Sequence, residues 1–114
     1  MSNYHEPAEE LSKETRDFSR ALNSLKEEIE AIDWYQQRVD ATSDEQLKAI
    51  LEHNRDEEIE HACMALEWLR RNMPGWEDEL RDNLFKDGDI AHHGHDEDED
   101  GSHESGELNI GTLK

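Results

Sequence analysis

The sequence is poor in apolar residues, in cysteine and in positive charge, and each shortage excludes a class of protein. Only 32% of the 114 residues are hydrophobic, and no apolar run approaches the roughly 20 residues that span a bilayer. The N-terminus has neither the basic nor the apolar part of a secretory leader. The single cysteine, Cys63, cannot form an internal disulfide, and its neighbours predict a buried or half-buried filler in a helix. These features predict a protein of the reducing cytoplasm.

The charge balance limits the partners. Lysine and arginine together number 12 against 31 aspartates and glutamates, which gives a formal net charge of −19. A chain of this charge repels a polyphosphate, so no nucleic-acid partner is expected, and an anionic membrane surface is disfavoured for the same reason. The same field attracts cations.

The apolar pattern predicts two long helices. Apolar residues between Pro7 and about Val39 recur in steps of three, four and seven, which indicates one long helix. Proline is a good first-turn residue, so Pro7 is the expected start. The stretch "DATSDEQ" (40–46) then breaks the pattern, and Ser43 within it has capping-box spacing to Gln46. The candidate N-caps are Thr42, Ser43 and Asp44.

The second long helix is expected to end at "NMPGW" (72–76), where proline and glycine stop it. A short third helix is expected over about 75–86. So short a connection makes the two long helices antiparallel neighbours. The predicted fold class is all-α, an antiparallel two-helix hairpin plus a short C-terminal helix, over residues 1–86. The residues expected to be core or dimer contacts include Trp68, Trp76, Leu80 and Leu84.

Beyond Lys86 the composition changes to glycine, histidine and dense acid. Residues 87–107 are therefore predicted to be a disordered linker. Its histidines offer metal-chelating groups, although a solvated spacer is the simpler interpretation. They are His92, His93, His95 and His103.

Ionisable residues interrupt the apolar faces of both long helices. Glu58 and His61 are three residues apart, on one face of the second helix. Glu28 interrupts the first helix in the same way. With the turn near residue 42, equal rise per residue places these three side chains at nearly the same height. No Lys or Arg is expected on the same faces, and two unpaired buried carboxylates are costly unless a dication neutralises them.

The donor set suits iron. Carboxylate oxygens with one imidazole are typical ligands of Fe(II) or Mn(II), and Zn(II) also accepts them. Ferritin-like di-iron proteins use a Glu from each of two helices and a Glu-x-x-His from each of two others, so this chain holds half of the set. Two copies would complete it. A plainer interpretation stays open: an E-x-x-H match arises easily in so acidic a chain, with His61 hydrogen-bonded between two flanking carboxylates.

Three stretches closely resemble the encapsulated ferritin family: "EEIEAIDWYQQRVDA" (27–41), "HNRDEEIEHA" (53–62) and "LEWLRRN" (66–72). The resemblance covers roughly residues 8–86. It implies a homodimer that forms a ferritin-like four-helix unit, with five dimers in a ring-shaped decamer. It also implies a ferroxidase that oxidises Fe(II) with O2 at a di-iron centre, two ions per dimer interface, for mineral storage inside an encapsulin shell.

The resemblance assigns the centre to particular residues. Glu28, Glu58 and His61 match the iron ligands, with Glu58 as the bridging carboxylate, and Tyr35 matches a tyrosine beside the centre.

Three further residues match an access site for metal ions. Glu27 and Glu30 match outer acidic residues that attract ions and pass them on, and Trp34 matches an aromatic residue beside them. Calcium, manganese or zinc are alternative ions at the centre or at this access site. His53 and Arg55 are interpreted as structural residues or as supports for the ligands.

The C-terminal "LNIGTLK" (108–114) is similar to encapsulin cargo-loading peptides. Leu108, Ile110 and Leu113 would fill pockets on a shell wall, and Gly111 would permit a bend. The expected location is therefore a nanocompartment within the cytoplasm.

Two other functions compete with the ferroxidase. One is a rubrerythrin-like di-iron protein that destroys peroxide or O2, and the other is a non-catalytic cargo adaptor that only binds metal.

Overall fold

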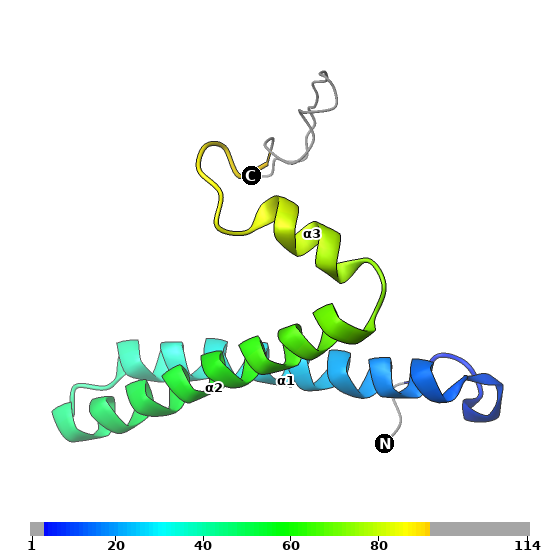
Figure 1. Cartoon of the computed structure of the whole chain (residues 1–114). Coiled ribbons are helices and arrows are strands. Elements are labelled where there is room, and N and C mark those ends of the chain that lie inside the picture. Colours follow the sequence, from blue (N-terminus) through cyan, green and yellow to red (C-terminus); the bar gives the residue numbers. More distant parts are fainter. Residues whose placement is uncertain (1–3, 92–114) are drawn as a thin grey trace. The chain divides into compact units, whose positions relative to one another are not determined.

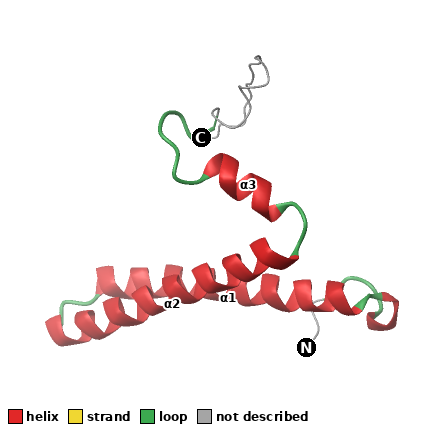
Figure 2. Cartoon of the chain, in the orientation of Figure 1, coloured by secondary structure: helices red, strands yellow, loops and turns green. Residues whose placement is uncertain are grey.

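The computed structural model describes residues 4–91, and every regular element in that range is helical (Figures 1 and 2). In chain order the elements are a short 3-10 turn η1 (Ala8–Glu10), α1 (Lys13–Ala41), α2 (Glu45–Asn72) and α3 (Trp76–Asn83). The predicted all-α class is confirmed. Among residues 4–91, no helix combines the length and the apolar character that crossing a bilayer requires. The chain divides into two compact units, Met1–Met73 and Pro74–Lys114.

The first long helix begins later than predicted. Pro7 leads only into η1, and α1 starts at Lys13. Its start is set by Ser12, whose Oγ accepts a hydrogen bond from the backbone N–H of Thr15 at 3.0 Å. A serine cap satisfies one of the amide groups that a helix N-terminus leaves unpaired, and the Pro7 side chain has no such acceptor.

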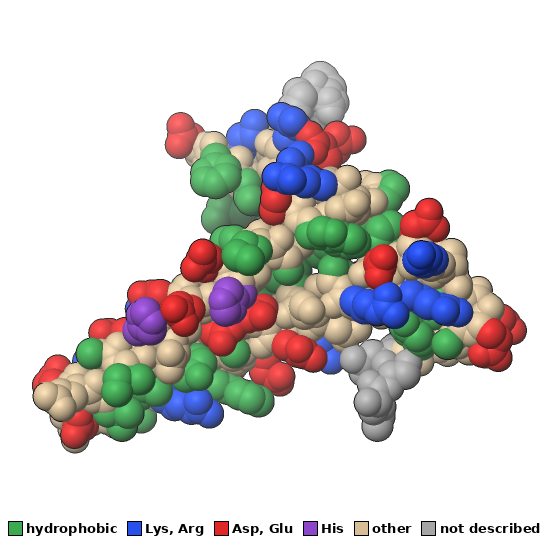
Figure 3. All heavy atoms as spheres, turned by 60° about the horizontal axis from the view of Figure 1, so that its bottom comes forward, with side chains coloured by type: hydrophobic (Ala, Val, Ile, Leu, Met, Phe, Trp, Pro, Cys, Tyr) green, Lys and Arg blue, Asp and Glu red, His purple; other side chains and the backbone are tan. Residues whose placement is uncertain are grey.

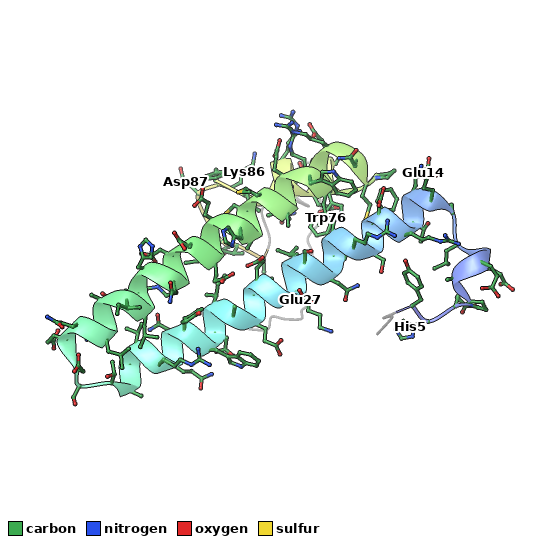
Figure 4. All side chains as sticks on the ribbon, turned by 90° about the horizontal axis from the view of Figure 1, so that it is seen from below. His5, Glu14, Glu27, Trp76, Lys86 and Asp87 are labelled. Atoms are coloured by element: carbon green, nitrogen blue, oxygen red, sulfur yellow. The ribbon has the colours of Figure 1, made fainter. Side chains whose placement is uncertain are left out.

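A connection of three residues, Thr42–Asp44, joins α1 to α2. Of the three candidate caps, Asp44 caps α2: its Oδ1 accepts a hydrogen bond from the backbone N–H of Leu47 at 2.9 Å. Thr42 instead closes α1 through its own backbone N–H, which donates to the Arg38 carbonyl. The two helices run antiparallel and lie side by side in Figure 1 and in Figure 4. The predicted hairpin is confirmed.

The second helix ends where the proline–glycine pair predicts. Asn72 is its last residue, and Gly75 follows with a φ of 103°, a left-handed conformation that glycine adopts without steric cost. In the second unit, α3 is shorter than the predicted 75–86: it ends at Asn83, where Leu84 turns to an extended conformation, and Phe85 follows with a positive φ of 59°. Residues 87–91 are exposed and non-helical. The rest of the expected linker and all of 108–114 lie outside the described residues.

The core of the hairpin is thin. Val39 and Leu51 are buried near the turn, and Leu69 is fully buried towards the other end. The rings of Phe18 and Trp68 pack edge to face across the helices, with centroids 6.3 Å apart. Burial of a leucine contributes about 1.5–3 kcal/mol, so these few side chains are a modest source of stability for helices of this length.

Some apolar residues of the two long helices are exposed. Ile29 keeps 56% of its surface and Ile50 keeps 58%. Cys63 is exposed as well, so the prediction of a buried or half-buried filler is wrong. Consecutive residues of a helix point about 100° apart, so Cys63 turns away from α1 when its neighbour Ala62 faces it.

The second long helix carries two neighbouring stripes of mainly apolar residues. The inner stripe faces α1 and is half-buried to buried: Leu51, Glu58, Ala62, Ala65 and Leu69. The outer stripe has heptad spacing and is more exposed: Leu47, Ile50, Asn54, Glu57, His61, Met64 and Trp68. One stripe suffices for one neighbouring helix. Two adjacent stripes are typical of a helix within a four-helix bundle.

Candidate metal centre

The structure brings Glu28, Glu58 and His61 together at one level of the hairpin. Nδ1 of His61 lies 3.5 Å from Oε1 of Glu28 and 3.6 Å from Oε1 of Glu58. One ligand atom from each residue lies within 4.8 Å of the other two. The two glutamate side chains are about 25% exposed and His61 is 48% exposed, so the cluster reaches the surface rather than being sealed in the hairpin.

The hairpin geometry explains this meeting. Glu28 lies fourteen residues before Thr42, and Glu58 lies fourteen residues after Asp44. At equal rise per residue the two glutamates stand at the same distance from the turn, one on each helix. His61 follows Glu58 by three residues and therefore lies beside it on α2. Glu58 belongs to the inner stripe and His61 to the outer one, so the cluster lies where the two stripes adjoin.

The electrostatics of the cluster favour a cation. The hydrogen bond between the carboxyl groups of Glu28 and Glu58 raises the pKa of Glu28 above 4.5, and partial burial and the charge of Glu58 raise it further. His61 lowers the pKa of Glu28, but its effect is smaller. Two carboxyl groups are thus held close together with only an imidazole beside them, which disfavours the doubly ionised state unless positive charge is added.

The two donor pairs that include His61 are close enough to share a first-row metal ion. Two ligands of one ion, each about 2.0–2.2 Å from it, lie at most about 4.4 Å apart. The two contacts of His61, at 3.5 and 3.6 Å, fall inside this limit. The mixture of carboxylate oxygen and imidazole nitrogen suits Fe(II), Mn(II) or Zn(II). Three protein ligands leave coordination positions open, and they cannot fill the shells of two ions.

The structure does not bring Tyr35 into this cluster. Tyr35 lies seven residues beyond Glu28 on α1, which corresponds to about 10 Å along the helix. Its half-buried ring instead faces Arg38, whose Cζ lies 5.3 Å from the ring centroid. Within one chain, Tyr35 therefore lies about two helical turns from Glu28, towards the connection between the helices.

The three residues of the expected access site lie outside the cluster. Glu27, Glu30 and Trp34 are all exposed, with Trp34 keeping 51% of its surface. Their spacing of three and four residues aligns them as one stripe on the surface of α1. Figure 4 labels Glu27 on that helix. Because Glu27 directly precedes Glu28, it points about 100° away from the ligand.

The structure gives His53 and Arg55 specific partners, which the sequence analysis did not predict. On α2, Nε2 of His53 lies 3.0 Å from Oε2 of Glu57. Arg55 reaches across to Gln36 on α1. The i,i+4 spacing of the first pair is visible in the sequence. No local spacing relates Arg55 to Gln36, because their contact exists only once the hairpin has formed. On the face seen in Figure 3, histidine side chains stand beside acidic ones along the long helices.

A two-helix hairpin with one glutamate opposite a Glu-x-x-His pair matches half of the ligand pattern of ferritin-like carboxylate metal centres. The comparisons with known proteins agree with this class. The family model described as EncFtn-like matches residues 3–87, and the chain belongs to this family.

Several relatives show how much of the chain is shared. A ferritin-like protein of Thermotoga maritima is 67% identical over 88 residues, 77% of each chain. An encapsulated ferritin-like protein of Rhodospirillum rubrum is 59% identical over 87 residues, which cover 76% of this chain and 62% of that one. The encapsulin nanocompartment cargo protein EncC of Myxococcus xanthus is 43% identical over 51 residues, 45% of this chain and 39% of that one.

A solved structure supports the same fold. The crystal structure of protein ne0167 from Nitrosomonas europaea superposes with a TM-score of 0.76 at 59% sequence identity. The match covers 80% of this chain and the whole of that one. The recognition of an encapsulated-ferritin chain, made above from three short stretches, is thereby confirmed.

Proposed function

We propose that the protein is a ferroxidase that oxidises Fe(II) with O2 at a di-iron centre shared by two copies of the chain. The observation that carries this proposal is the half set of ligands: Glu28, Glu58 and His61 converge in one chain, with too few donors for two ions. A second copy related by twofold symmetry adds the same three residues, giving four carboxylates and two imidazoles.

The outer stripe of α2 supplies the surface for this pairing. Ile50 keeps 58% of its surface and Met64 keeps 61%, on either side of His61 along the stripe. Apolar residues at heptad spacing are the usual seam between packed helices. An interface on this seam places the His61 of each copy at the boundary. The two clusters therefore meet by the same contact that buries the apolar side chains.

Each residue has its own role at the proposed centre. Bound iron supplies the electrons that O2 accepts, and Fe(II) is the substrate. The carboxylates of Glu28 and Glu58 neutralise the positive charge and favour Fe(III) over Fe(II), while His61 contributes a neutral nitrogen donor that orients the site. Glu58 is proposed as the carboxylate that would be shared by two ions, as the resemblance to the encapsulated ferritin family implies. Tyr35 is proposed to act at the centre only in the assembled dimer.

Supply of iron is proposed to begin at the exposed stripe of Glu27, Glu30 and Trp34. Its two carboxylates lie on the surface of a chain with a formal net charge of −19, which concentrates cations near the protein. Rotation by about 100° separates Glu27 from the ligand Glu28 on α1. An ion held at the stripe is therefore next to the centre, although not in it.

Storage of the product is proposed to take place inside an encapsulin shell. The support comes from two relatives, one described as encapsulated and one as an encapsulin nanocompartment cargo protein. Residues 108–114 are proposed to bind the shell wall, and a dimer assembled into a ring-shaped decamer is the proposed cargo.

The activity is tested by loading the protein with Fe(II) without oxygen and then admitting air. The wild type is expected to form ferric absorbance rapidly and to consume O2 in fixed proportion to iron. E58Q and H61A should lose this rapid phase, because each removes a donor from both ions. The matched control is E60Q, which changes an exposed glutamate of α2 outside the cluster.

The same experiment separates the competing functions. Tight metal binding without rapid ferric absorbance would identify a non-catalytic adaptor. Loss of peroxide driven by an electron donor, with little oxidation of added Fe(II), would identify a rubrerythrin-like protein. Normal oxidation rates in both E58Q and H61A would contradict the proposed centre itself.

A further inference from the structure

One side-chain link joins the two helices close to the metal centre. Nη1 of Arg55, on α2, donates a hydrogen bond to Oε1 of Gln36, on α1, at 2.9 Å. Arg55 lies three residues before Glu58 and is about 25% exposed. On α2 the link therefore begins about one helical turn from Glu58, and on α1 it ends at Gln36, eight residues or about 12 Å from Glu28, on the side nearer the connection between the helices.

The guanidinium of Arg55 is held in a defined orientation. Its Nε and Nη2 both donate to Oδ1 of Asp56, at 3.1 and 3.0 Å. This fixes the plane of the group, so that Nη1 points at Gln36 rather than at solvent. The contact differs from the ion pairs of Arg20 and Arg81, whose partners are on the arginine's own helix.

The axial position of one helix against the other matters for this site in particular. Glu28 is on α1, whereas Glu58 and His61 are on α2. A slide by one residue moves the ligands of one helix by about 1.5 Å, whereas metal–ligand distances tolerate about 0.2 Å. Few apolar side chains are buried between the two helices, so packing alone gives limited resistance to such a slide. A hydrogen bond from a planar, anchored guanidinium is directional and adds to this resistance.

The geometry points to Arg55 as a positioning residue of the metal centre. Through Gln36 it sets the axial register of α1 and α2, and this register brings Glu28 to the level of Glu58 and His61. The role in metal binding rests on the proposed function, whereas the register is a property of the metal-free hairpin.

The effect on metal binding is tested with R55M and Q36M, which keep an unbranched side chain at each position and remove the link. Anaerobic titration with Fe(II), and with Co(II) as a spectroscopic probe, should show binding about tenfold weaker in either variant. The double variant should bind no more weakly than R55M, because the two residues act through one contact. R55K should recover part of the loss, since lysine keeps a donor. The control R20M changes a contact within α1 and should bind as the wild type does.

A second readout reports the register without any metal. Spin labels on Cys63 and on a cysteine introduced at Lys26, both exposed, measure the distance between the helices in protein diluted with unlabelled chain. We expect R55M to shift or broaden the distance distribution while keeping the same helix content as the wild type. If the wild type binds neither ion, the proposed function fails, and the distance distribution still decides the role of Arg55.

Three results would overturn the inference. The first is an unchanged distance distribution in R55M. The second is wild-type affinity in both R55M and Q36M. The third is an equal loss of affinity in R20M, or a loss that follows helix content, because either would assign Arg55 to general stability.

Discussion

The dimer interface is most directly tested by the substitution Ile50→Ala. Ile50 is in the outer stripe of α2 and keeps 58% of its surface in the single chain. A second copy that packs on this stripe would bury that surface. The change shortens the side chain and introduces no charge. Any loss of dimer therefore reports lost apolar contact rather than repulsion.

The magnitude follows from the exposed fraction. Complete burial of an isoleucine side chain contributes about 1.5–3 kcal/mol, and a little over half of that side chain is available here. Alanine keeps part of the contact, which leaves a loss of about 1 kcal/mol per copy. In a twofold interface the residue occurs twice, so the dimer loses about 2 kcal/mol. Its dissociation constant should then rise about 30-fold.

Sedimentation velocity over a series of concentrations measures this dissociation constant. The control is Ile59→Ala. Ile59 keeps 43% of its surface and lies nine residues further on, about half a turn round α2 from Ile50. This substitution should leave the dimer constant unchanged. An equal weakening by both substitutions, or a wild type that is monomeric while fully active, would refute the reasoning.

Three further predictions concern stability. Because its pKa is raised, Glu28 stabilises the metal-free fold below about pH 4.5, and this stabilisation is lost as the pH rises. E28Q should therefore resist urea better than the metal-free wild type at pH 7, and the difference should be smaller at pH 4. The same variant should fail to bind Fe(II). Hydrogen bonds from Arg70 and Arg71 lower the pKa of Glu67 to about 2, so they stabilise the fold fully above about pH 4.5 and lose this effect as the pH falls towards 2. The melting temperature should therefore change less between pH 6 and pH 3 in E67Q than in the wild type. Leu69 is fully buried, and Leu69→Ala should lower the free energy of unfolding by about 2–5 kcal/mol in urea titrations, where a value under about 1 kcal/mol would contradict the assigned core.

The long helices were predictable because their signals are local. Spacing of three, four and seven residues identified them, and the proline–glycine pair marked the end of α2. The start of α1 was misjudged because Pro7 and Ser12 are both acceptable near a helix N-terminus. Which of them begins the helix depends on the backbone between them, and here η1 intervenes.

The exposure of individual residues was less predictable. Cys63 and Ile50 belong to an amphipathic helix, but the pattern does not say how much of that helix one neighbour covers. The division of α2 into an inner and an outer stripe appears only when α1 is in place. It follows from the limited width of a helix–helix contact.

The sequence by itself determined the residue types of the candidate metal centre, their helical spacing and the equal distances of Glu28 and Glu58 from the turn. These are consequences of helical periodicity and chain length, which act between near neighbours. Only the tertiary structure decided that the carboxyl group of Glu58 lies close enough to raise the pKa of Glu28, that Tyr35 stands two turns away from Glu28, and that Arg55 links the two helices. Those contacts depend on the distance and rotation between two helices, which packing sets and no local pattern encodes.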